Sequence, residues 1–227
     1  NDNTTGAYNT AVGYGALDAN TTANDNTAVG RNALGANTTG AQNVAIGKDA
    51  LDANTTANDN TAVGTGALGA NTTGGQNVAV GTYSLDANTT ASYNTAIGYW
   101  ALSDNTTGQT NSAVGRGSLK ANTTGDDNCA FGHEALYVNT GGSKNIAIGR
   151  AALEQNTASE NTAVGHLAME DNTTGTKNVA VGAFCLDANT TGNGNTCVGY
   201  WAGSVQTSSN DNTFVGYYAG YPSTGYR

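Results

Sequence analysis

The sequence has little charge, and positive charge is especially scarce. Only 11% of the 227 residues are charged, and eight Lys and Arg residues stand against seventeen Asp and Glu residues, for a net charge of −9. Proteins that bind nucleic-acid phosphates need a surface rich in Lys and Arg. The composition therefore argues against a nucleic-acid partner.

Long apolar runs are missing as well. No stretch of about 20 apolar residues is present, so the sequence predicts no membrane span. No signal-peptide pattern opens the chain, which indicates a mature protein or an excised segment. Residues 1–8 correspond to the second half of a repeat described below, and we expect another segment or subunit to stack against them.

Cysteine is rare, and the three cysteines fall at different places in the repeat. They are Cys129, Cys185 and Cys197, and each stands where other copies carry Thr, Val or Ala. The simplest interpretation is that they act as small apolar members of the core. A disulfide between Cys185 and Cys197 is the alternative.

Residue groups that support catalysis or metal binding are not found. His133 and His166 share one repeat position but are two repeats apart, so we expect exposed corner residues and not ligands. Several aspartates share another position in non-consecutive repeats and are expected to be solvated, with weak calcium binding as the alternative. These are Asp18, Asp52, Asp86 and Asp187. The sequence predicts no enzyme, no metal and no cofactor.

What the chain does contain is one motif, Asn-Thr-Ala-Val-Gly or a close variant, in thirteen copies. Successive copies are 17 residues apart, except for a 16-residue step between Asn145 and Asn161. Such regularity indicates one short structural unit stacked on itself. The copies begin at Asn9, Asn26, Asn43, Asn60, Asn77, Asn94, Asn111, Asn128, Asn145, Asn161, Asn178, Asn195 and Asn212.

Counting the Asn as position 1 shows what each unit keeps. Position 5 is Gly in all thirteen copies, position 4 is Val or Ile except at Phe131, and position 9 is Leu in most copies. A fixed Gly marks a turn that excludes a side chain, and 17 residues are too few for a helical repeat. The sequence therefore predicts an all-β fold: a single domain over residues 1–227, built as a parallel β-solenoid of thirteen coils about 60 Å long.

The side-chain pattern gives expectations for the inside and the outside of each coil. We expect two main strands per coil, with positions 4 and 9 buried. Position 3 is Ala in eleven copies and lies on the face opposite to position 4. A strand that is apolar or small on both faces is usually covered on both, so the alanine column is predicted to contact a partner.

The other positions that recur between copies predict polar ladders and a second turn that can vary in length. Stacked Asn side chains at positions 1 and 12 are expected to hydrogen-bond along the rod. The same Asn-Thr-Thr triplets match the N-glycosylation pattern, but a glycan on every coil would be crowded. In the 16-residue coil we expect the missing residue to come from the second turn, since Asn156 and Thr157 keep their phase.

The segments at residues 43–47, 77–81 and 145–149 resemble the head repeats of trimeric autotransporter adhesins of the YadA type. The longer form, Asn-Thr-Ala-Val-Gly through Asn-Thr-Thr-Gly, is similar to repeats of phage tail fibres and related surface fibres. The resemblance covers the whole chain and implies left-handed parallel β-rolls that associate as a homotrimer outside the cell. The coil is longer here than in those heads, and no stalk, coiled coil or membrane anchor is present.

Aromatic residues break the regularity of the corner at positions 6 and 7, and residues 195–227 form atypical, aromatic-rich terminal coils. Exposed aromatic side chains can cap the solenoid, contact a subunit, or stack on a glycan or protein receptor. Capping or subunit contact is the favoured interpretation, because Gly203 and Gly220 replace the core Leu nearby. The candidate contacts are Tyr99, Trp100, Phe184, Tyr200, Trp201, Tyr217 and Tyr218.

Because the repeats encode a rod and no reactive site, the sequence predicts a structural or adhesive fibre component on a cell or virion surface. The alternatives are a receptor-binding shaft of a phage tail fibre, a head-to-tail filament subunit and an ice-binding solenoid. The last is suggested by a threonine column at position 13. That column includes Thr21, Thr38, Thr55 and Thr72.

Overall fold

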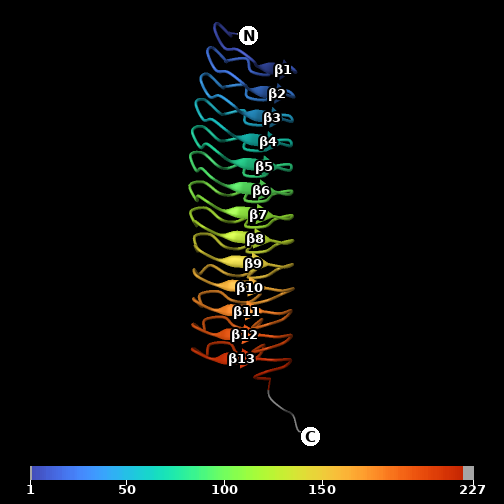
Figure 1. The fold of residues 1–227 in the computed structure, drawn as a ribbon, viewed down its shortest axis with the longest axis vertical. Helices are drawn as coiled ribbons and strands as arrows, with labels where there is room; N and C mark the ends of the chain where they lie inside the picture. Colours follow the sequence, from blue (N-terminus) through green and yellow to red (C-terminus); the bar gives the residue numbers. More distant parts are fainter. Residues whose placement is uncertain (1, 222–227) are drawn as a thin grey trace.

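The computed structural model describes residues 2–221 and is a single column of coils (Figure 1). Each coil contributes one three-residue strand, and the thirteen strands form one parallel sheet in sequence order. No helix occurs among the described residues, and hence none that could cross a membrane. The predicted all-β parallel solenoid is confirmed, although residues 222–227 of its last coil lie outside the described residues.

We number the coils by their strands, so that coil 1 begins at Asn9. The strands are β1 (Thr10–Val12), β2 (Thr27–Val29), β3 (Val44–Ile46), β4 (Thr61–Val63), β5 (Val78–Val80), β6 (Thr95–Ile97), β7 (Ser112–Val114), β8 (Cys129–Phe131), β9 (Ile146–Ile148), β10 (Thr162–Val164), β11 (Val179–Val181), β12 (Thr196–Val198) and β13 (Thr213–Val215).

The register of the sheet is unbroken, including at the shortened coil. Ile146 pairs with Cys129 on one side and with Thr162 on the other, in the same register as every other position 2. The missing residue is position 14. Thr157 keeps the position-13 bond to the Thr173 carbonyl oxygen at 2.9 Å, and the Ala158 carbonyl accepts from Asn145 and Asn156 as the position-15 carbonyl does in other coils. The prediction that the second turn absorbs the deletion is confirmed.

The expectation of two strands per coil is wrong. The Leu at position 9 adopts a left-handed backbone, with φ of 52° at Leu68 and 53° at Leu85. Its N–H still donates to the next coil, as from Leu68 to the Ser84 carbonyl at 3.0 Å. Positive φ is incompatible with an extended strand, so this side of the coil is a hydrogen-bonded turn.

The lumen is lined by small side chains on the sheet side and by Leu on the opposite side. Ala62 at position 3 and Leu68 at position 9 are both fully buried. The predicted burial of position 9 is confirmed, but position 4 faces outward: Val63 is half-buried and Ile97 is 39% exposed. The prediction therefore assigned the two faces of the strand the wrong way round. Position 3 faces the lumen, where the walls are so close that only Ala fits opposite Leu.

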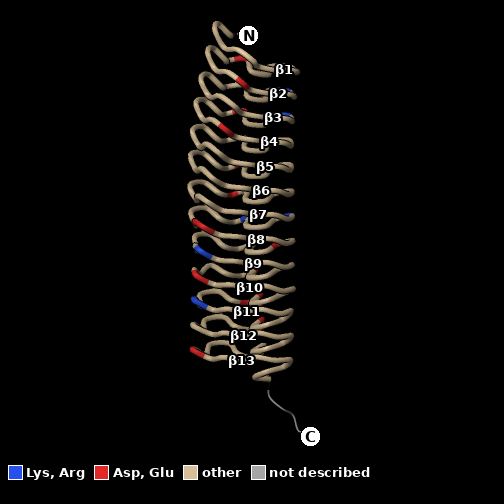
Figure 2. The backbone as a smooth tube through the Cα atoms, viewed as in Figure 1, with Lys and Arg blue, Asp and Glu red and all other residues tan. Residues whose placement is uncertain are grey.

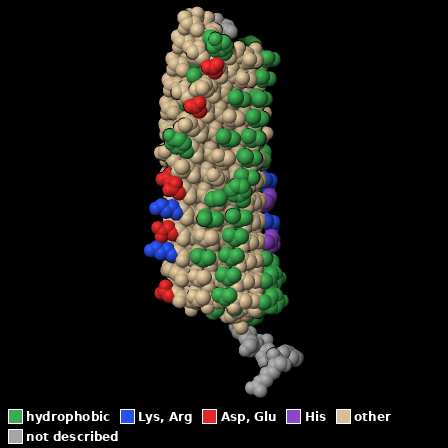
Figure 3. All heavy atoms as spheres, viewed as in Figure 1, with side chains coloured by type: hydrophobic (Ala, Val, Ile, Leu, Met, Phe, Trp, Pro, Cys, Tyr) green, Lys and Arg blue, Asp and Glu red, His purple; other side chains and the backbone are tan. Residues whose placement is uncertain are grey.

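The outward positions 2 and 4 therefore form two parallel columns of side chains on the sheet. Figure 3 shows hydrophobic side chains in rows that follow the rod over its length. Position 2 is Thr or Ser in eight coils and Val, Ile or Cys in five, and position 4 is Val, Ile or Phe throughout. The alanine column that was predicted to contact a partner lies inside the lumen instead.

Both predicted Asn ladders are present and buried. Asn60 at position 1 donates to the Gly74 carbonyl at 3.0 Å, and its Oδ1 accepts the backbone N–H of Asn77 at 3.0 Å. Asn71 at position 12 donates to the same Gly74 carbonyl at 2.9 Å and to Asn54 Oδ1 at 3.3 Å. The two ladders thus converge on one carbonyl in each coil, and their burial leaves these side chains inaccessible to glycosylation.

The Gly at position 5 is required by geometry. Gly81 has φ of 138°, and a Cβ built there would lie 2.5 Å from the Gly98 carbonyl oxygen of the next coil. No side chain can be accommodated at that distance without moving the backbone. The repeat therefore keeps Gly where neighbouring coils approach most closely.

Charged residues at position 17 alternate in sign along one edge of the rod. Figure 2 shows this alternation along the edge beside β8 to β11. Asp127, Lys144, Glu160 and Lys177 occupy the position in four successive coils. One pair, Lys177 and Glu160, is 4.0 Å apart between charged atoms and largely exposed, so each contact contributes little stability.

Candidate functional site

Five of the seven predicted contact residues form one cluster at the C-terminal end of the rod. At position 7, Phe184 stacks on Trp201 with ring centroids 4.9 Å apart, and Trp201 stacks on Tyr218 at 6.1 Å. At position 6, Tyr200 stacks on Tyr217 at 5.6 Å. Because equivalent positions recur at the strand spacing, aromatic residues in consecutive coils form columns.

Two members of this cluster are not among the predicted contact residues. His166 packs edge-on against Phe184, with ring centroids 5.3 Å apart, and Tyr221 packs edge-on against Tyr218 at the same distance. His166 could have been found, since it occupies position 6 in the coil directly before Phe184. Tyr221 belongs to the last described turn, where the repeat pattern has ended.

The stacking geometry limits what the cluster can bind. A sugar stacks on the open face of an aromatic ring, but each face of Trp201 is covered by a neighbouring ring, Phe184 on one side and Tyr218 on the other. Trp201 therefore offers no open face to a sugar, whereas Tyr200 and Tyr217 are 42% and 73% exposed. This arrangement favours a role in packing at the end of the rod over sugar stacking.

The space left by the missing core Leu residues is filled from inside the lumen. A Cβ at Gly203 would lie 2.7 Å from Cys197 Sγ, and a Cβ at Gly220 would lie 2.5 Å from Phe214 Cδ1. Bulky neighbours were expected to close the solenoid here, but the corner aromatics are not the residues that fill the lumen. Larger position-3 side chains do so.

Tyr99 and Trp100 lie apart from the cluster, in the middle of the rod. Their rings are 4.4 Å apart and tilted by 32°, and no ring stacks on them from coil 7, which carries Arg116 and Gly117 at these positions. Instead Lys120 Nζ lies 5.8 Å from the Trp100 ring centroid. The pair thus forms a small separate patch, 41% and 37% exposed.

The histidines lie on the outer corner beside arginines. Arg116 Nη1 is 2.7 Å from His133 Nε2, and Arg150 Nη1 is 3.3 Å from His166 Nε2. Glu134 pairs with both Arg116 and His133 at 3.2 Å. Within residues 2–221, no group of three His, Cys, Asp or Glu residues is arranged to hold a metal ion.

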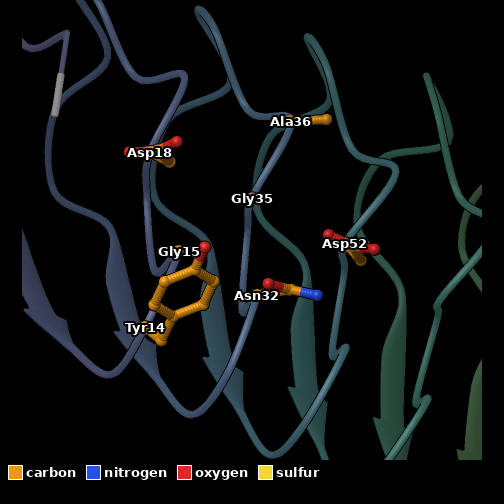
Figure 4. Close-up of a pocket in the computed structure, with 7 residues that line it drawn as sticks. All are labelled: Tyr14, Gly15, Asp18, Asn32, Gly35, Ala36 and Asp52. Carbon is orange, nitrogen blue, oxygen red and sulfur yellow. The ribbon is translucent and has the colours of Figure 1, made fainter.

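A shallow depression of about 440 Å³ lies near the N-terminal end, between the corner and the turn (Figure 4). Asp18 and Asp52 line it from two coils, separated by Gly35, with Tyr14 and Asn32 nearby. Burial raises the pKa of Asp52, and the Asp49 charge raises it further. Two carboxylates from alternate coils make a polar groove but not a catalytic pair with a defined partner.

The chain matches no protein-family model, no curated protein and no solved structure, so the assignment of its functional surfaces depends on the geometry described above.

Proposed function

We propose that this chain is a structural or adhesive component of an extracellular fibre, a rigid rod that associates with copies of itself along the outer face of its sheet. The observation that supports this proposal is the pair of outward columns at positions 2 and 4. Apolar members of these columns remain substantially exposed in the single chain, including Ile97 at 39%, Phe131 at 43% and Ile148 at 42%.

The size of this face calls for a partner. Twelve steps of ~4.8 Å give a length of ~58 Å, and the two columns are about 6.6 Å apart along the strand. The strip between them alone is on the order of 400 Å². It is apolar along all of position 4 and in five coils at position 2, and apolar patches of a few hundred Å² mark interaction sites on soluble proteins. Burial of such a face would stabilise an assembly by the hydrophobic effect.

A second copy of the same chain fits this face better than an unrelated protein. No copy of the repeat places a charged residue at position 2 or 4, so two such faces meet without like-charge repulsion. Both faces also share one spacing along the rod, which lets β-branched side chains of one copy pack between those of another. By the resemblance to adhesin heads, we propose a homotrimer on a cell or virion surface.

Charged substitutions on the outer face test the proposal. In the variant Val63→Glu/Val80→Glu/Ile97→Glu, we expect the assembly to dissociate while each chain keeps its β-sheet circular dichroism, because these side chains point away from the lumen. Light scattering coupled to size exclusion gives the mass. Alanines at position 3 are unsuitable for this test, since Glu at buried Ala62 would disrupt the coil itself.

The matched control is Thr73→Glu/Thr90→Glu/Thr107→Glu, which adds the same charge to the same three coils at exposed position 14. It should keep the parental mass. A monomeric parent would refute self-association, and a broad distribution of lengths would point to a head-to-tail filament in place of a closed trimer.

Ice binding is less well supported than it was by the sequence alone. The position-13 hydroxyls donate to carbonyls of the next coil, as from Thr38 to Thr55 and from Thr106 to Thr123, both at 3.0 Å. That column is therefore engaged with the backbone and is not an unbroken free hydroxyl surface. Thermal hysteresis of the parent chain at micromolar concentration would nevertheless favour ice binding.

A further inference from the structure

Two of the three cysteines of the chain meet inside the lumen. Cys185 is at position 8 of coil 11, and Cys197 is at position 3 of coil 12, within β12. Both are fully buried, and the Cys185 thiol donates to the Cys197 carbonyl oxygen at 3.1 Å. They are the only cysteines at these two positions in the chain.

Local packing gives these thiols room that other coils lack. Positions 3 and 8 line the lumen, and in most coils both are Ala, with the Leu at position 9 filling the remaining space. In coil 12 that Leu is replaced by Gly203, and Cys197 Sγ lies in the vacated space, 2.7 Å from where a Cβ at Gly203 would be. The cysteine pair thus lies next to Gly203, at the first coil in which position 9 has no side chain to fill the lumen.

We propose that Cys185 and Cys197 form a disulfide that links coil 11 to coil 12 when the chain folds in an oxidising compartment. This inference does not depend on the proposed fibre function. All three cysteines are free thiols in the structure. The third, Cys129, lies on the outer face of β8, partly exposed, and is expected to stay free on oxidation.

The reaction must precede closure of the lumen. Both thiols are fully buried in the folded chain, out of reach of a small-molecule disulfide. The neighbouring Cys197 side chain and burial also raise the pKa of Cys185, and a protonated thiol is a poor nucleophile. In the open chain, the Cys185 thiolate attacks a small-molecule disulfide and releases one thiolate of that reagent. The Cys197 thiolate then attacks Cys185 Sγ in the mixed disulfide and releases the second. Two protein thiols are oxidised and the reagent disulfide is reduced to two thiols.

Refolding the full chain tests the assignment. The denatured, reduced chain is refolded in a mixture of oxidised and reduced glutathione, denatured again without reductant, and labelled with a maleimide. We expect one labelled thiol per chain in place of three, and a peptide map that joins residues 185 and 197. The thermal midpoint should rise by about 5–10 °C over the reduced chain.

Three variants serve as controls. Cys185→Ala and Cys197→Ala restore the residue that most other coils carry, so both should fold, keep two labelled thiols and show no oxidation-dependent rise in the midpoint. Cys129→Ser should keep the full rise and leave no labelled thiol. Three labelled thiols in the refolded parent, or a cross-link through Cys129, would overturn the proposal.

Discussion

Phe214 occupies the interior space opposite Gly220, where a Cβ would lie 2.5 Å from its ring. In coils 2 to 11 the arrangement is reversed, with Ala at position 3 facing Leu or Met at position 9. In coil 13 the large side chain is at position 3 and the small residue is at position 9, the reverse of coils 2 to 11, so each layer of the lumen stays filled. Interiors packed at this density are sensitive to single changes of volume.

Replacing Phe214 by Ala should open a cavity at the C-terminal end. A buried Phe→Ala change costs roughly 3–5 kcal/mol, and we expect the lower part of that range or less because Phe214 is only half-buried. The double variant Phe214→Ala/Gly220→Leu recreates the pair found in other coils and should recover most of the loss. Urea unfolding measures both, and a double variant no more stable than Phe214→Ala would contradict the reversed packing of coil 13.

Gly81→Ala should be strongly destabilising. The added Cβ meets the Gly98 carbonyl at 2.5 Å, in addition to the strain of a φ of 138°. Gly216→Ala separates the two effects, because it has a φ of 126° but no atom within 4 Å of the added Cβ. We expect the thermal midpoint of Gly81→Ala to fall much further than that of Gly216→Ala. Equal falls would show that steric contact between coils is unimportant.

Loss of one ladder amide should affect two coils at once. Asn77→Ala leaves the buried Asn94 N–H without its acceptor at 3.0 Å, and it removes one of the two donors to the Ala91 carbonyl, which keeps its bond from Asn88. Each unsatisfied buried group costs about 1–3 kcal/mol. Asn58→Ala removes an exposed amide that accepts one backbone hydrogen bond, and it should cost clearly less. Hydrogen exchange at residues 77–94 would locate the effect, and unchanged protection there would contradict it.

Stability should fall as pH rises from about 4 to above 6. Burial raises the pKa of Asp86 and of Asp187 from 3.8 to about 6. A raised carboxyl pKa means that the folded chain prefers the neutral form, so its contribution is complete below the unfolded pKa and is lost as pH passes the folded pKa. The thermal midpoint should therefore be higher at pH 4.5 than at pH 7.5. Asp86→Asn/Asp187→Asn should flatten this dependence, and an unchanged profile would contradict it.

The repeat period of the sequence was enough to predict most of the fold. It placed every observed strand and its register, the two Asn ladders, the Leu column and the position of the one-residue deletion, but it also predicted a second strand per coil where the chain forms a turn. It could not decide which face of the strand is interior, because Ala is compatible both with a narrow lumen and with a closely approaching partner. That choice depends on the distance between the walls, which is set by the left-handed turn at Leu68 and its equivalents.

The repeat period also explains which of the candidate contact residues lie together. Residues at one repeat position in consecutive coils had to stack, which brought Phe184, Trp201 and Tyr218 together, whereas Tyr99 and Trp100 are five coils from Phe184 and stay separate. Exposure alone did not show that the stacked rings cover one another's faces. Self-association itself stays a prediction.

The alternating charges at position 17 give coils 7 to 10 an order that their cores do not. Because the cores are nearly identical, a folding chain could loop out one coil and still satisfy its ladders and its Leu contacts. Such a skip would place Asp127 on Glu160, or Lys144 on Lys177, and so set like charges side by side. Each native pair is worth little, but a mispaired rod would exchange these weak attractions for repulsions, and the edge would act as a check on the counting of coils.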